Sequence, residues 1–274
     1  MSNKRTKPFS IKYLPGFTPV ALVCFVLLYA PIVTMVVYSF NSGQSVALFE
    51  DFSVAWYFAA AENELVQEAA LRSLIIAAFA SGIATVLATM AALGTTRTKN
   101  YPGRTLIYLM INQPLMVPEV VTAVALLIFF ASIKVATGYS GLAYLILAHA
   151  AFCVPFAYLP IRARMEGMDR ALEIAAADLY ATPWKTFRRV TLPLVAPGIA
   201  AGAMLAFVIS LDDVIITEFV KSAGQDTLPT YMLGQLRRAV TPEVNAISSA
   251  LLAVTVILLT AFFLLSGRNS PVGK

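Results

Sequence analysis

Charged residues are scarce in this sequence. Asp, Glu, Lys and Arg make up 13% of the chain, about half the share of a typical soluble domain. Apolar residues reach 59%, which is more than one core can bury. The polar residues that remain are too few to cover the surface. This excludes an ordinary soluble globule, a disordered chain and a coiled coil. The composition predicts an all-α integral membrane protein that crosses the bilayer several times.

Residues that perform catalysis or hold metals are also few. The two cysteines, Cys24 and Cys153, lie in apolar runs and offer neither a disulfide framework nor a metal-ligand spacing. We interpret the single histidine, His149, as a packed, hydrogen-bonded residue rather than a proton relay. No glycine-rich phosphate loop and no nucleophile turn occurs. We therefore expect no catalytic residue, no metal site and no cofactor in this chain, so any uphill transport needs a partner or an ion gradient.

Six apolar segments are long enough to cross the hydrocarbon, which takes about 20 residues of α-helix. The first follows several basic residues, as in a signal peptide. Its apolar stretch is too long and has no small-residue cleavage site, so we interpret it as a retained span. The predicted spans cover residues 17–40, 71–95, 105–133, 141–160, 192–220 and 245–265.

The basic residues predict the orientation of the chain. Fifteen of the 20 lysines and arginines fall on one side of the predicted spans and five on the other. Positive charge is concentrated on the cytoplasmic side of membrane proteins, so both termini are expected in the cytoplasm. The larger group is Lys4, Arg5, Lys7, Lys12, Arg97, Lys99, Arg104, Arg162, Arg164, Arg170, Lys185, Arg188, Arg189, Arg268 and Lys274.

The chain has no linker-like tract or tandem repeat, which predicts one membrane domain with a leading span. We expect residues 1–66 to form a cytoplasmic tail, the first span and an outer loop. Residues 67–266 form the main transmembrane domain, and residues 267–274 form a cytoplasmic tail. In the outer loop, Trp56 and Tyr57 favour an interfacial helix, because such aromatics settle at the headgroup level.

The segment DRALEIAAADLY, from Asp169, predicts a short helix in the cytoplasmic loop. Asp169 is a good N-cap residue and the alanines favour helix. Alanines also allow another protein to approach closely, so the helix is either a docking element or a plain connector with a solvated face.

This segment and those around it resemble the inner-membrane permeases of binding-protein-dependent ABC importers, in the spermidine/putrescine permease branch. That family carries an EAA motif whose helix seats in a cleft of the ATPase subunit. Ile174 stands where the motif has glutamate, with Glu173 one place earlier, and Tyr180 stands where it has glycine. The positions that fit are Ala175, Ala176, Asp178, Leu179, Ala181, Thr182, Pro183, Phe187, Val190, Thr191, Leu192 and Pro193.

Other landmarks of the branch follow in the same order along nearly the whole chain. They are YAPIVTMVVYSFN, FSVAWY, PLMVPEVVTAVALL, ISLDD and TLPTYMLGQLRRAVTPEVNAISS. The resemblance implies the type I ABC importer permease fold, with six transmembrane helices and a cytoplasmic coupling helix. It implies as partners a second homologous permease, two ATPase subunits that bind ATP and magnesium, and a periplasmic binding protein. The residues it implies in ATPase coupling are Glu173, Ile174, Ala175, Ala176, Asp178, Leu179 and Tyr180.

Three of the acids within the predicted spans, Glu119, Asp212 and Asp213, are candidates for a substrate path, because a carboxylate in the bilayer is costly unless it pairs or faces water. Glu119 lies about 21 Å into its span and Asp212 about 30 Å into its own. With Asp213, they occupy the middle-to-outer part of the bilayer, where a cation from the periplasm would meet them. Adjacent helical residues point about 100° apart, so we expect one of Asp212 and Asp213 to be structural.

The sequence thus favours a bacterial inner-membrane permease for polyamines such as putrescine or spermidine, surrounded by lipid and without a nucleic-acid partner. An ion-coupled secondary transporter of a small cation is the alternative from another class. An ABC permease for 4-aminobutyrate, opines or another amine is the alternative within the family. The buried acids disfavour a scaffold without transport.

Overall fold

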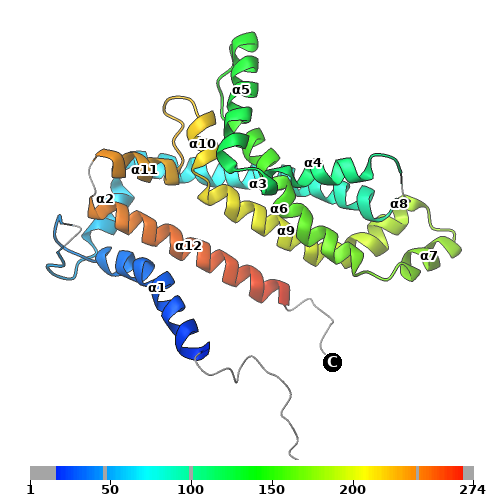
Figure 1. The fold of residues 1–274 in the computed structure, drawn as a ribbon, viewed down its shortest axis with the longest axis horizontal. Helices are drawn as coiled ribbons and strands as arrows, with labels where there is room; N and C mark the ends of the chain where they lie inside the picture. Colours follow the sequence, from blue (N-terminus) through cyan, green and yellow to red (C-terminus); the bar gives the residue numbers. More distant parts are fainter. Residues whose placement is uncertain (1–16, 46–47, 99–100, 239–240, 268–274) are drawn as a thin grey trace, which may run out of the picture. The chain divides into compact units, whose positions relative to one another are not determined.

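The computed structural model describes residues 17–45, 48–98, 101–238 and 241–267. Within these ranges the chain is helical and has no strand, only an isolated bridge between Asn41 and Phe52. Both predicted tails lie mainly outside the described residues, as do Lys4, Arg5, Lys7, Lys12, Lys99, Arg268 and Lys274. The helices (Figure 1) are α1 Phe17–Tyr38, α2 Ala55–Glu62, α3 Glu64–Thr96, α4 Arg104–Met116, α5 Glu119–Thr137, α6 Ala143–Glu166, α7 Ala171–Asp178, α8 Pro183–Thr186, the π-helical turn η2 Phe187–Thr191, α9 Leu192–Asp212, α10 Ile215–Val220, α11 Leu228–Arg238 and α12 Pro242–Gly267.

Six helical segments of the described chain are long and apolar enough to cross a membrane, which confirms the predicted number. Each coincides with or overlaps a predicted span. The segments are Thr18–Tyr38, Glu64–Thr96, Glu119–Thr137, Ala143–Glu166, Pro183–Asp212 and Pro242–Leu264.

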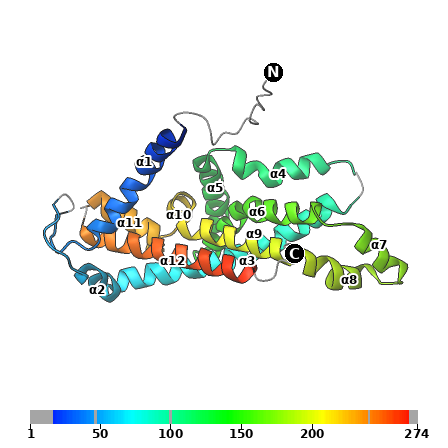
Figure 2. The same cartoon turned by 90° about the horizontal axis from the view of Figure 1, so that it is seen from below.

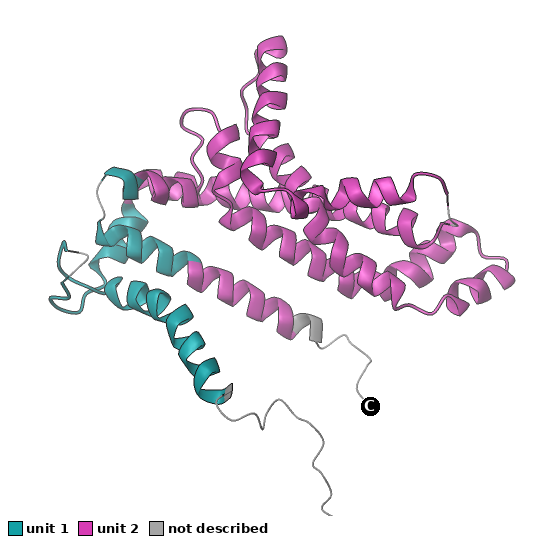
Figure 3. Cartoon of the chain, viewed as in Figure 1, with its two compact units in different colours: residues 1–62, 235–251 teal, residues 63–234, 252–274 magenta. Residues whose placement is uncertain are grey.

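The chain divides into two compact units (Figure 3). One contains residues 1–62 and 235–251, and the other contains residues 63–234 and 252–274. In the first unit, the loop after α1 is organised by buried Asn41, which donates to the carbonyls of Ser45 at 3.0 Å and Leu48 at 2.8 Å. Its side-chain oxygen accepts the Glu50 N–H at 2.8 Å. The hydrogen bonds of this one side chain therefore hold the backbone of the loop together.

The second unit is built on α3, α6 and α9, which lie side by side in both views (Figures 1 and 2). Glycines on α9 allow close approach to α6, since a Cβ at Gly202 would lie 2.6 Å from the Ala157 carbonyl oxygen. Small residues are the usual means of packing transmembrane helices closely. On α3, fully buried alanines recur every three or four residues, at Ala77, Ala80, Ala84, Ala88 and Ala92.

The predicted third span is wrong as a continuous helix. The chain breaks at Val117, which is extended (φ −106°, ψ 141°), and Pro118, so that α4 ends and α5 begins at Glu119. Proline has no N–H and forces the preceding residue out of the helical region. As a result α5 runs across the direction of α3, α6 and α9 (Figure 1).

Two other predicted boundaries are also corrected. The second span begins at Glu64 rather than near residue 71, because the Asn63 side chain caps α3 by accepting the Leu65 N–H at 3.1 Å. Only Ala55–Glu62 of the outer loop therefore forms a separate helix, α2. The fifth span ends at Asp212, since Asp213 is extended (ψ 133°) and α10 starts afresh at Ile215.

Candidate functional site

Asp213 lies in the break between α9 and α10 and is buried, with 7% of its surface exposed. Its carboxylate accepts the backbone N–H of Ile216 at 3.2 Å and of Thr217 at 2.9 Å. The Thr217 hydroxyl donates to it as well, at 3.0 Å. An acidic side chain in this position satisfies N–H groups that have no partner within the helix. Asp213 therefore holds the first turn of α10, whose N-cap residue is Val214.

His149 joins this cluster from α6 and is 1% exposed. Its Nδ1 lies 2.8 Å from the Ser210 hydroxyl, and its Nε2 lies 2.9 Å from the Thr217 hydroxyl and 3.4 Å from Asp213 Oδ2. Because the Thr217 hydroxyl gives its hydrogen to Asp213, it accepts from Nε2–H, which leaves Nδ1 to accept from Ser210. The structure confirms the interpretation of His149 as a packed, hydrogen-bonded residue.

Glu119 is the first residue of α5 and is partly buried. Its carboxyl group lies close to the Asp213 carboxyl group, because the break at Pro118 lets α5 pack against α10. Free N–H groups at the start of a helix favour a negative charge there. Two carboxyl groups in contact require a proton or a cation between them.

Asp212 differs from its neighbour in its surroundings. It is the last residue of α9 and is exposed, whereas Asp213 is buried. The structure thus brings Glu119 and Asp213 together and leaves Asp212 apart. Sequence reasoning missed Ser210 and Thr217 as members of this cluster. Ser210 lies three residues before Asp213 and Thr217 lies four residues after it. This spacing does not indicate that the three side chains meet unless the helix break at Asp213 is known.

The predicted docking helix forms as α7. The Asp169 carboxylate accepts the Ala171 N–H at 2.9 Å, but the residue at the N-cap position is Arg170, whose side chain makes no capping hydrogen bond. Large apolar side chains at this helix and its end are exposed: Ile174 by 61%, Leu179 by 82% and Tyr180 by 95%. Ala175 and Asp178 are exposed with them. An exposed apolar group of this kind is typical of a protein–protein contact.

Glu173 and Ala176 lie on the other face of α7 and are partly buried. The Glu173 carboxylate lies 3.0 Å from Nε of Arg97, at the end of α3. It also accepts from the Thr191 hydroxyl, in η2, at 2.7 Å. Glu173 therefore fixes α7 to its own chain.

Tyr180 closes α7 in a left-handed conformation, with φ 59°, and is the one non-glycine residue with positive φ in the described ranges. Its N–H donates to the Ala177 carbonyl at 2.9 Å, and the Ala181 N–H donates to the Ala176 carbonyl at 3.0 Å. This pair of bonds is the Schellman motif, which glycine usually completes. A tyrosine here costs about 1–2 kcal/mol in backbone energy. The EAA motif has glycine at this position, and glycine adopts the left-handed conformation easily. Tyr180 adopts that conformation in place of the glycine.

The family model described as "Binding-protein-dependent transport system inner membrane component" matches residues 84–270. Among characterised proteins, the putrescine transport system permease protein PotI of Escherichia coli is 37% identical over 251 residues, covering 90% of this chain and 89% of PotI. The spermidine/putrescine transport system permease protein PotC of Haemophilus influenzae is 32% identical over 248 residues, covering 90% and 95%.

Two solved structures are similar in fold. A chain of a bacterial ABC transporter involved in import of the acidic polysaccharide alginate matches with a TM-score of 0.71 at 15% identity, covering 92% of this chain and 93% of that one. A chain of the inward-facing MetNI methionine ABC transporter matches with a TM-score of 0.63 at 16% identity, covering 75% and 96%.

Proposed function

The chain belongs to the family of binding-protein-dependent transport system inner membrane components, and from this we propose that it passes polyamines through an ATP-driven importer. It is a multi-pass protein of the bacterial inner membrane with the type I ABC importer permease fold. The observation that carries the substrate class is the match over 90% of the chain to permeases named for putrescine and spermidine. The match does not support the ion-coupled alternative.

The proposed complex contains this chain, a second homologous permease, two ATPase subunits and a periplasmic binding protein. ATP and magnesium bind to the ATPase subunits, so this chain is a transport subunit rather than an enzyme. Both termini face the cytoplasm, as the uneven distribution of lysines and arginines supports. The proposed division is residues 1–66 as tail, first span and outer loop, residues 67–266 as permease domain, and residues 267–274 as cytoplasmic tail.

A polyamine carries ammonium groups separated by apolar methylenes, and its path needs carboxylates as countercharges. Glu119 meets this need because it lies at a helix start beside Asp213, where the pair accommodates a proton or a cation. An ammonium group of the substrate can replace that proton. Asp212 is exposed and offers a second contact, whereas Asp213 acts by holding α10 and His149 in place.

The exposed face of α7 and its end provide the ATPase contact in this proposal. That face consists of Ile174, Ala175, Asp178, Leu179 and Tyr180. Glu173 and Ala176 contribute from the opposite face by holding α7 against the chain, so that a movement of the ATPase passes through Glu173 and Arg97 to α3. With Ile174 in place of an acid, the contact at that position is apolar.

Ala175→Arg tests this contact. A long, charged side chain on the exposed face prevents close approach of the ATPase, so we expect purified ATPase to be lost from the complex and uptake to fall at least ten-fold. The chain itself should insert and fold normally, since Ala175 is exposed in the structure. Co-purification and substrate uptake are the measurements.

Ala175→Ser is the matched control, because serine differs from alanine by one hydroxyl and should preserve both readouts. Normal uptake and normal co-purification in Ala175→Arg would show that α7 is a connector and not the docking element.

A further inference from the structure

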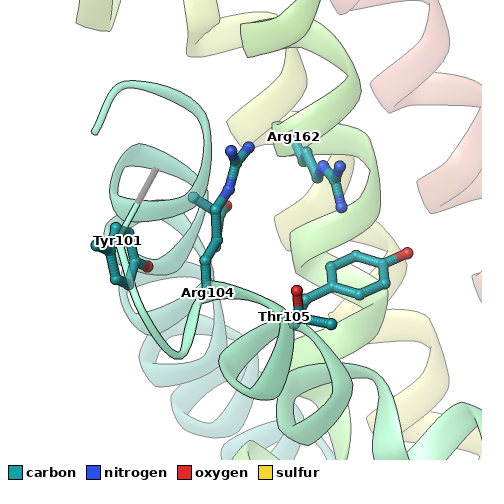
Figure 4. Close-up of a pocket in the computed structure, with 6 residues that line it drawn as sticks. Tyr101, Arg104, Thr105 and Arg162 are labelled. Carbon is teal, nitrogen blue, oxygen red and sulfur yellow. The ribbon is translucent and has the colours of Figure 1, made fainter. Parts of the chain in front are cut away.

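A pocket of about 390 Å³ lies away from the acid cluster, where the end of α3, the start of α4 and the last turns of α6 meet. Arg104 and Arg162 stand on two sides of the hollow, one from α4 and one from α6 (Figure 4). The complete lining is Thr95, Tyr101, Arg104, Thr105, Tyr108 and Arg162. It therefore contains two guanidinium groups and four hydroxyl groups, and no carboxylate.

The Arg162 side chain is held in a defined position. Its guanidinium carbon lies 4.7 Å from the centre of the Tyr108 ring and 5.9 Å from that of Tyr158. Its Nε donates to Glu166 at 2.8 Å. Stacking and this bond fix the plane of the guanidinium group, and Nε is only one of its donor atoms. An arginine fixed in this way is suited to a planar, two-point contact with an oxyanion.

Thr95 forms a wall of the pocket rather than a donor, because its hydroxyl is engaged with the Tyr158 hydroxyl at 2.9 Å and the Ala91 carbonyl at 2.8 Å. The other lining residues that carry donor groups are the two arginines with Tyr101, Thr105 and Tyr108. The lining contains two arginines and no carboxylate, and the Glu166 carboxylate is paired with Arg162, so the pocket does not suit a polyamine. The same composition suits a phosphate group, which arginine binds through paired hydrogen bonds.

The pocket also lies at the ends of membrane-spanning segments, since Thr95 is next to the last residue of one span and Arg162 is near the end of another. Tyrosine and arginine at span ends are typical of the headgroup region. Beyond the pocket, α4 exposes large apolar side chains at Leu106, Ile107, Leu109 and Met110. A phosphate in the pocket would thus have an apolar surface beside it for acyl chains.

We propose that this pocket binds a phosphate group, and that the group belongs to an anionic phospholipid. Basic pockets between transmembrane helices on the cytoplasmic side are known to take such headgroups. The leaflet follows from the proposed orientation, which places the end of α3 in the cytoplasm, but the phosphate chemistry does not depend on it. The site is separate from the polyamine path and sets a lipid requirement for the folded subunit.

The test is a titration of the full importer complex, purified in detergent, with dioctanoyl phosphatidylglycerol, dioctanoyl phosphatidylcholine and inorganic phosphate. Bound lipid is counted by native mass spectrometry, and thermal stability is followed in parallel. Phosphatidylglycerol should bind and raise the melting temperature, and phosphatidylcholine should bind less well. Arg104→Gln should weaken phosphatidylglycerol binding about ten-fold, as expected for one charged hydrogen-bonding partner.

Arg189→Gln is the matched control, because Arg189 is an exposed arginine of the same predicted side and lies outside the pocket. Its phosphatidylglycerol binding should equal that of the unchanged complex. If Arg104→Gln fails to assemble, Arg162→Lys keeps the charge while removing the planar group, and binding should still weaken. Both readouts are independent of substrate uptake, so failure of this proposal leaves the transport function untouched.

Three outcomes are distinguished. Arginine-dependent binding of phosphatidylglycerol supports the lipid as the source, and arginine-dependent binding of inorganic phosphate alone supports the site but identifies a soluble ligand. Equal phosphatidylglycerol binding in Arg104→Gln, Arg162→Lys and Arg189→Gln, with no response to phosphate, overturns the assignment.

Discussion

Asp213→Ala is expected to destabilise the folded chain by about 3–5 kcal/mol, the usual effect of removing one partner from a buried charged network. The change removes the acceptor of two backbone N–H groups at the start of α10 and of the Thr217 hydroxyl. It also leaves His149 Nε2 without its acidic neighbour. In purified protein, the thermal midpoint should fall by about 10 °C.

Asp212→Ala is the matched control, since it removes the same side chain from the adjacent, exposed position. Its thermal midpoint should stay within a few degrees of the unchanged protein, and any loss should appear in uptake instead. Equal midpoints for the two variants would contradict the assignment of Asp213 as the structural member of the pair.

Glu119→Gln is expected to lower polyamine uptake ten- to hundred-fold while assembly and basal ATP hydrolysis persist. The amide keeps the size of the side chain and can donate a hydrogen bond to Asp213, so the α5 start should stay in place. It lacks the charge that an ammonium group needs in a partly dehydrated path, a loss of about 1–3 kcal/mol. Uptake of labelled putrescine by the reconstituted complex is the measurement.

Glu243→Gln provides the control for this change. Glu243 lies in the first turn of α12 as Glu119 does in α5, and both are partly buried. Uptake in Glu243→Gln should stay within about two-fold, because Glu243 is not one of the acids proposed for the path. Uptake by Glu119→Gln as high as that of Glu243→Gln would remove Glu119 from the path, and a collapse of expression would make its role structural.

Local sequence properties predicted much of this fold. Hydrophobic length located six spans, because the bilayer requires long apolar helices whatever the tertiary structure. The alanines and Asp169 predicted the position of α7, although its N-cap is Arg170, since helix propensity and the hydrogen bond from Ala171 to Asp169 act within a few residues. The lone His149 in an apolar span predicted a buried, hydrogen-bonded side chain for a similarly local reason.

The acid cluster could not be predicted in this way. Glu119, His149 and Asp213 are far apart in the sequence and meet only because the chain breaks at Pro118 and again at Asp213. Prolines within membrane spans are often tolerated without a break, so Pro118 alone did not fix the end of the helix. The ion pair on the inward face of α7 could not be predicted either, because the partner of Glu173 is Arg97, which lies at the end of a helix distant in sequence.

ATP-driven polyamine import is tested most directly by uptake into liposomes that contain the whole complex. The chain would be reconstituted with its second permease and ATPase subunits, and labelled putrescine supplied with the binding protein while an ionophore removes all ion gradients. We expect uptake to require both ATP at the ATPase side and the binding protein, and to continue in the presence of the ionophore. Uptake that proceeds without ATP and follows an imposed ion gradient would contradict this function.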